Sequence, residues 1–176
     1  MGIDDLLKYF GRPVTNPAFD DFLSRNGVEE RFEYSSDSGI PFALLEIPVS
    51  GISMEFIKPR EFADDFGAVQ EDGDLLFSKV FLYIAAEDNY YAYSGAWPSV
   101  VPKPTLPEAC ISKLGHPDFI RDEDDDFGQT NTVEYTWDQT NGYSVFVRFT
   151  KQPLAVRHIV ITPARVRGTL NASHHD

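Results

Sequence analysis

The most concentrated chemistry in the sequence is a run of five consecutive acidic residues, Asp122-Glu123-Asp124-Asp125-Asp126. Asp122, Asp124 and Asp126 have the alternate spacing of ligands in a calcium-binding loop. In such a loop, however, glycine would fall at the seventh position (Gly128) instead of the sixth, and the twelfth would be Val133 instead of a bidentate glutamate. The sequence therefore favours a solvated loop kept open by self-repulsion, or a docking site for a basic partner.

Aromatic side chains form a second candidate site. Tyr90, Tyr91, Tyr93 and Trp97 surround a predicted strand over residues 90–95 and the proline-rich segment that follows it. About half of them should belong to the core, and the others could anchor an interface, where Tyr and Trp dominate the binding energy. The predicted partner-binding residues are Asp122, Glu123, Asp124, Asp125, Asp126, Tyr91, Tyr93 and Trp97.

Catalytic and metal-binding patterns are weak. The single cysteine, Cys110, lies on a predicted helix where a small buried residue is expected, and the serines lack a Gly-x-Ser-x-Gly arrangement. His116 falls in a helix stop, His158 is expected to be a hydrogen-bonded, half-buried residue of the last strand, and His174 and His175 are in the tail. We therefore expect no catalytic residue, no metal and no cofactor, and an enzyme is the minority hypothesis.

Charge narrows the class of partner. The 176 residues contain 15 Lys and Arg against 28 Asp and Glu, which gives a net charge of −13. A general nucleic-acid binder needs clustered basic residues, so this balance argues against one and favours a basic partner. The acidic N-terminus lacks the pattern of a secretory signal, and no apolar run approaches the length of a membrane span. The expected location is the cytoplasm, with no membrane association.

In the first two thirds of the chain, the spacing of apolar residues predicts helices and strands. Apolar residues at helical intervals indicate a helix over 3–10, and Asn16 followed by Pro17 begins another. Strands are expected over 42–47, 52–57 and 75–85, and a short helix from 106 or 107 to 114. The stretch 58–74 is rich in acidic residues and is expected to be a long loop with about one helical turn.

The last third predicts a three-stranded meander. Val133, Tyr135 and Trp137 alternate with polar residues, and Asn141-Gly142 is a strong hairpin signal. Alternation continues over 143–149, and a third strand is expected over 155–161. Short turns between sequential strands predict antiparallel pairing with one buried face.

These elements predict an α+β fold, mostly antiparallel sheet with a few helices packed on one face. Phe10-Gly11-Arg12-Pro13 and Leu114-Gly115-His116-Pro117 share one form. Two pseudo-repeated units of helix plus sheet would explain this, and so would the common use of Gly and Pro to end helices. We expect one domain over 1–165, with potential lobes 1–57 and 75–165 joined by the acidic segment 58–74, and a flexible tail over 166–176.

A family resemblance runs through residues 50–162. It is carried in order by Gly51-Ile52-Ser53-Met54-Glu55-Phe56, Val80-Phe81-Leu82-Tyr83, Tyr93-Ser94-Gly95-Ala96-Trp97-Pro98, Leu114-Gly115-His116-Pro117, Tyr135-Thr136-Trp137-Asp138, Val145-Phe146-Val147-Arg148-Phe149 and His158-Ile159-Val160-Ile161. This order resembles the cytosolic immunity proteins encoded beside bacterial polymorphic toxins, including contact-dependent and type VI secreted ones. A helix-end motif followed by a sheet is also similar to β-lactamase-inhibitor-like and outer-membrane-assembly lipoprotein folds, whose members are exported.

The resemblance implies inhibition by occlusion: the protein would bind the C-terminal domain of a cognate toxin as a monomer or weak dimer. A basic toxin such as a nuclease would complement the acidic charge. The alternative is an adaptor or chaperone that escorts a secreted effector without inhibiting it.

Overall fold

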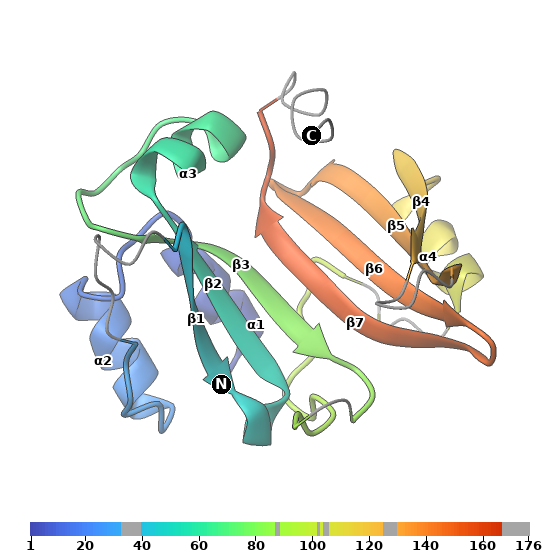
Figure 1. Cartoon of the computed structure of the whole chain (residues 1–176), viewed down its shortest axis with the longest axis horizontal. Helices are drawn as coiled ribbons and strands as arrows, with labels where there is room; N and C mark the ends of the chain where they lie inside the picture. The colour runs from blue at the N-terminus through green and yellow to red at the C-terminus, as the bar shows by residue number, and fades with distance from the viewer. Residues whose placement is uncertain (33–39, 87–88, 102, 104–105, 125–129, 167–176) are drawn as a thin grey trace.

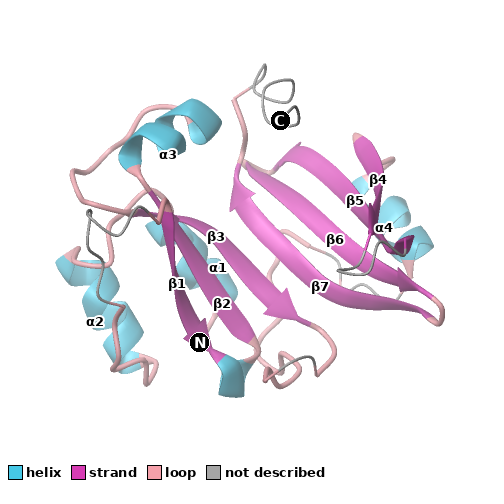
Figure 2. Ribbon diagram, in the orientation of Figure 1, coloured by secondary structure: helices cyan, strands magenta, loops and turns pink. Residues whose placement is uncertain are grey.

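Seven antiparallel strands form one sheet in the computed structural model, which describes residues 1–32, 40–86, 89–101, 103, 106–124 and 130–166 (Figures 1 and 2). The strands are β1 (Phe42–Ile47), β2 (Ile52–Ile57), β3 (Leu76–Tyr83), β4 (Phe119–Asp124), β5 (Thr130–Thr140), β6 (Tyr143–Lys151) and β7 (Leu154–Pro163). Their order across the sheet is β1-β2-β3-β7-β6-β5-β4. The predicted α+β class is confirmed.

The helices do not all cover the same face of this sheet, as was expected, because the third packs on Ile57 and Leu76, which alternate with the core residues Phe56 and Phe77. The α-helices are α1 (Ile3–Leu6), α2 (Pro17–Arg25), α3 (Pro59–Phe66) and α4 (Pro107–Leu114), with 3-10 turns η1 (Leu7–Tyr9) and η3 (Pro48–Ser50). Buried side chains of α1, α2 and α4 share the main core with the sheet, whereas Phe62 of α3 packs in a second cluster with Ile57 and Leu76. None of the helices in the described part of the chain has the length and apolar character needed to cross a membrane.

Local sequence explains where α2 begins. The Asn16 side chain accepts hydrogen bonds from the N–H groups of Ala18 and Phe19, and Pro17 occupies the first helical position. Phe19 then stacks on Tyr9 with ring centroids 4.8 Å apart, and it also contacts Phe77 of β3. The cap therefore sets the start of the helix, and the aromatic contacts fix its position on the sheet.

The C-terminal meander follows the predicted alternation. Val145, Val147 and Phe149 of β6 have no exposed surface, and Trp137 of β5 is nearly as buried. The Trp137 indole donates a hydrogen bond to the Gly115 carbonyl at 2.9 Å, which joins the end of α4 to the sheet. Between β5 and β6, Asn141 and Gly142 have φ of 53° and 83°, the left-handed pair that a tight hairpin requires.

Other expectations need correction or stay open. The segment 58–74 contains the two-turn helix α3, because Pro59 begins it and Phe62 gives it a buried contact. The predicted strand over 90–95 is wrong beyond a single bridge at Tyr90, since the N–H groups of Tyr91 and Tyr93 make isolated hydrogen bonds to Pro48 of η3 and to Tyr83 at the end of β3, without a strand ladder.

Pairing of β2 with β3 joins the two predicted lobes in one sheet. The duplication of helix-plus-sheet units stays a prediction. Of the predicted tail, only Val166 lies within the described residues, where its N–H donates to the Asp65 carbonyl at 3.0 Å.

Candidate functional site

The acidic run begins in a strand and not in a loop. Asp122, Glu123 and Asp124 belong to β4, where they pair with residues of β5; Asp125 and Asp126 lie outside the described residues. Asp122 is exposed and forms an ion pair with Lys151 at 2.7 Å. The loop interpretation is therefore wrong over 122–124, where the backbone is an extended strand paired with β5.

The aromatic candidates separate into exposed and packed side chains. Tyr91 is 67% exposed, whereas Tyr93 and Trp97 are half-buried against the main core. The Tyr93 hydroxyl donates to the Ala96 carbonyl at 2.6 Å, and the Trp97 indole donates to the Val101 carbonyl at 2.8 Å. Burial raises the pKa of Tyr93. Tyr91 alone of these three is therefore available as a large exposed anchor.

The two predicted sites are not brought together. Tyr93 is hydrogen-bonded to the end of β3, while the acidic residues lie on the edge strand β4. Strands β7, β6 and β5 separate β3 from β4, a distance of about 19 Å at about 4.8 Å per strand. A single small contact could not include both groups.

The structure reveals a polar row across the sheet that sequence reasoning missed. Strand register places Glu134, Arg148, His158 and Tyr83 side by side on β5, β6, β7 and β3. These residues alternate with the buried apolar positions, so they lie on the face opposite the main core. Arg148 forms an ion pair with Glu134 at 3.1 Å. The period-two pattern could have placed each residue on this face, but the order of the strands brings them together.

The pKa of His158, within the polar row, is strongly lowered. Burial, and then the charges of Arg148 and Arg157, lower its pKa to about 3. Its Nδ1 atom is buried and has no hydrogen-bond partner in the described part of the chain. The prediction of a half-buried histidine is correct, but this nitrogen lacks the expected hydrogen bond. A histidine with such a low pKa is a poor general base near neutral pH.

The row continues toward β1 through stacked tyrosines. Tyr83 stacks on Tyr90 with ring centroids 4.0 Å apart, and the Tyr90 hydroxyl donates to the Glu46 carboxylate. Desolvation, followed by the hydrogen bond to Glu46, raises the pKa of Tyr90. These contacts hold the face rigid and lead to the other edge of the sheet.

Exposed apolar side chains gather along that edge, and we call them the β1 patch. Its members are Ile40, Phe42, Leu44, Val49 and Tyr91, each at least 41% exposed. Phe42 and Leu44 are two residues apart in β1 and so share one side of the strand. A hydrogen bond from the Tyr91 N–H to the Pro48 carbonyl at 3.0 Å places Tyr91 beside η3. The alternation at 40–44 predicts a strand, but not that the strand lies at an edge.

Nucleophilic and metal chemistry receives little support from the described residues. Cys110 is buried in the main core, and burial raises the pKa of its thiol to about 11, which suppresses the reactive thiolate. Within the described ranges, no three His, Cys, Asp or Glu side chains are grouped so that they could hold a metal ion.

Comparison with known proteins gives no relative: no protein-family model matches the chain, and neither curated proteins nor solved structures match it significantly.

Proposed function

We propose that this chain is a cytoplasmic immunity protein that binds a basic toxin domain and blocks access to its active site. The observation that carries the proposal is the β1 patch, an exposed apolar surface on a strongly acidic protein. Contiguous exposed apolar side chains commonly mark protein-interaction sites, and large ones such as Tyr91 supply most of the binding energy. The resemblance over residues 50–162 supplies the class of partner.

The charge around the β1 patch supports a basic partner. Phe42 lies in a groove of about 390 Å³ that is also lined by Glu61, Asp64 and Asp65. Lys79 lines the same groove, but it forms an ion pair with Glu55 at 2.7 Å, which offsets its charge. An apolar centre beside carboxylates fits a surface that presents Lys or Arg around apolar side chains.

The acidic run at 122–126 has a different role in this proposal. Its described part, Asp122 to Asp124, lies at the opposite edge of the sheet, so we assign the run a role in the long-range field and not in the contact. Replacing Asp124, Asp125 and Asp126 by Asn or Ser should slow association and reduce its salt dependence, with little change in the dissociation rate. An unchanged association rate at low salt would refute this steering role.

Co-expression tests the function. The C-terminal domain encoded by the gene immediately upstream is expressed in a test bacterium with and without this chain. Killing by the domain alone, rescue by the chain, and co-purification at low salt are the expected results. A domain that is harmless alone but insoluble without the chain would favour an escort protein. The affinity of an escort protein for apolar segments would be insensitive to salt. Absence of binding would refute both.

A further inference from the structure

A groove runs along the free edge of the sheet, between β1 and the chain that follows α2. Residues 27–32 form one wall and residues 44–49 the other, and the groove holds about 510 Å³. Strand β1 pairs with β2 on its other side. No hydrogen bond joins the two walls, both of which lie within the described residues. Alternate residues of an edge strand direct their N–H and C=O groups away from the sheet, so β1 offers these groups to the groove.

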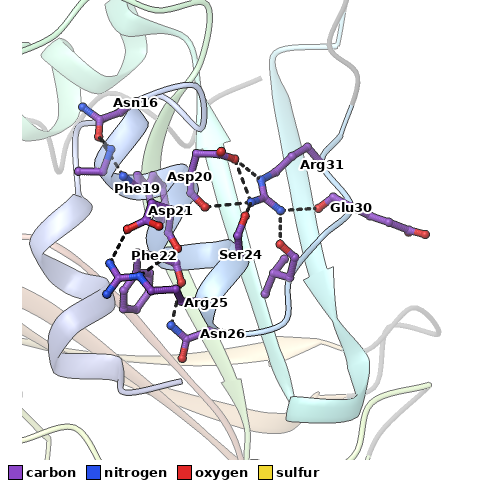
Figure 3. A network of polar contacts seen from close by, with 12 residues as sticks. Asn16, Phe19, Asp20, Asp21, Phe22, Ser24, Arg25, Asn26, Glu30 and Arg31 are labelled. Carbon is purple, nitrogen blue, oxygen red and sulfur yellow. Dashed lines mark hydrogen bonds and ion pairs between the residues drawn. The ribbon is translucent and has the colours of Figure 1, made fainter.

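The groove wall formed by residues 27–32 is held in place by contacts with α2 and the core. Figure 3 shows the Arg31 guanidinium turned toward α2, where it forms an ion pair with Asp20 at 2.9 Å and donates to the Ser24 hydroxyl at 3.1 Å. The Val28 N–H donates to the Leu23 carbonyl at 3.0 Å, and the Phe32 ring packs on Phe56 with centroids 4.9 Å apart. Because α2 and the core hold this wall, the groove does not need to form when a ligand arrives.

Apolar side chains lie in the groove and carboxylates lie on its rim. Leu44 is 41% exposed and Val49 is 76% exposed. Glu29, Glu30 and Glu46 are exposed groove residues, and Figure 3 shows the Glu30 side chain pointing away from Arg31. Arg31 also lines the groove, but its positive charge is offset by the ion pair with Asp20. The glutamate carboxylates therefore dominate the charge at the rim.

We propose that this groove receives an extended segment of the basic partner, which adds to the sheet as a strand beside β1. This inference rests on the proposed function for the identity of the partner. Main-chain hydrogen bonds to β1 would supply affinity, and side chains of alternating apolar and basic character would meet Leu44, Val49 and the glutamates. A second copy of this chain is disfavoured, because it would bring the same carboxylates together in a pair of proteins that each carry a charge of −13.

A peptide tests the groove independently of the toxin. The probe is a short capped peptide of alternating Val and Lys, and a peptide of alternating Val and Glu is its control. Hydrogen exchange of the full chain should show slower exchange at residues 42–47 with the basic peptide and no change with the acidic one. Protection at residues 119–124 instead, or equal effects of the two peptides, would overturn the proposal. Protection of 42–47 that appears at high protein concentration without peptide would assign the groove to a second copy.

Matched variants on the two sheet edges provide the second measurement. Leu44→Arg places a bulky cation in the groove, whereas Ile120→Arg makes the same kind of change at a residue of β4 that is 59% exposed. Leu44→Arg should weaken binding of the basic peptide and of the toxin domain by about 10- to 100-fold, whereas Ile120→Arg should have only the small effect of one added charge. Thermal unfolding verifies that each variant is folded.

The outcomes separate this inference from the proposed function. If the Leu44→Arg variant still rescues the bacterium and binds the toxin domain as tightly as the wild type, the groove is not the binding site, while the immunity function stands. If the basic peptide protects residues 42–47 but the wild-type chain does not bind the toxin domain, the groove is a binding site for basic peptides and the immunity function is refuted.

Discussion

Replacing His158 tests whether the polar row holds a neutral imidazole inside the folded protein. The residue lies between Tyr83 and Arg148 in the strand register, and burial together with Arg148 and Arg157 lowers its pKa to about 3. His158→Gln keeps a polar side chain at this position but removes the titrating group. The variant should therefore make the free energy of unfolding less dependent on pH.

The size of this effect follows from the two pKa values. An unfolded histidine titrates near 6.5, so between about pH 6.5 and pH 3 the unfolded chain binds a proton that the folded chain does not. Stability from this residue is fully present above the unfolded pKa and is lost as pH falls toward the folded one, by up to about 1.4 kcal/mol per pH unit. At pH 5 the loss is about 2 kcal/mol.

Urea unfolding at pH 7.5 and pH 5 measures the prediction. The wild type should lose about 2 kcal/mol more than His158→Gln between these two values, and the contributions of the carboxylates cancel in the comparison. His116→Gln is the matched control, because it removes an exposed histidine that is not a member of the polar row. It should follow the wild type. Equal losses in the wild type and His158→Gln would show that the folded protein accommodates the imidazolium, and the argument from burial would be wrong.

Three further substitutions test local features by urea unfolding near neutral pH. Asn16→Ala removes the side chain that caps α2 and should cost about 1 kcal/mol, whereas Asn16→Ser should retain most of the stability; equal losses would argue against the cap. Gly142→Ala should cost about 1 kcal/mol through the positive φ alone, because an added Cβ meets no atom within 4 Å; an unchanged midpoint would contradict the hairpin geometry. Trp137→Phe removes buried volume and the hydrogen bond to Gly115, and it should cost about 2–3 kcal/mol; a loss below about 0.5 kcal/mol would mean that the core readily closes around the change.

The predictions for the candidate site residues were partly wrong because the place of each residue in the assembled sheet could not be predicted from the sequence. The acidic run was expected in a loop because its charges repel one another, yet β5 supplies pairing partners for Asp122, Glu123 and Asp124. Tyr91, Tyr93 and Trp97 were predicted to bind the partner, yet of these three only Tyr91 stays exposed, since Tyr93 turns back to the Ala96 carbonyl. Pairing with a distant strand and closure of a loop depend on residues far away in sequence, and local patterns do not report them.

Elements that depend on neighbouring residues could be read from the amino-acid sequence. Asn16-Pro17 begins a helix, Asn141-Gly142 turns a hairpin, and alternation over 143–149 divides a strand into a buried and an open face, because caps, turns and side-chain direction depend on adjacent residues. The pairing of β3 with β7, which leaves β1 and β4 as the two edges, is known from the folded structure and not from local patterns. That pairing brings His158 beside Tyr83 and leaves the β1 patch uncovered, because strand order is set by the packing of the whole core.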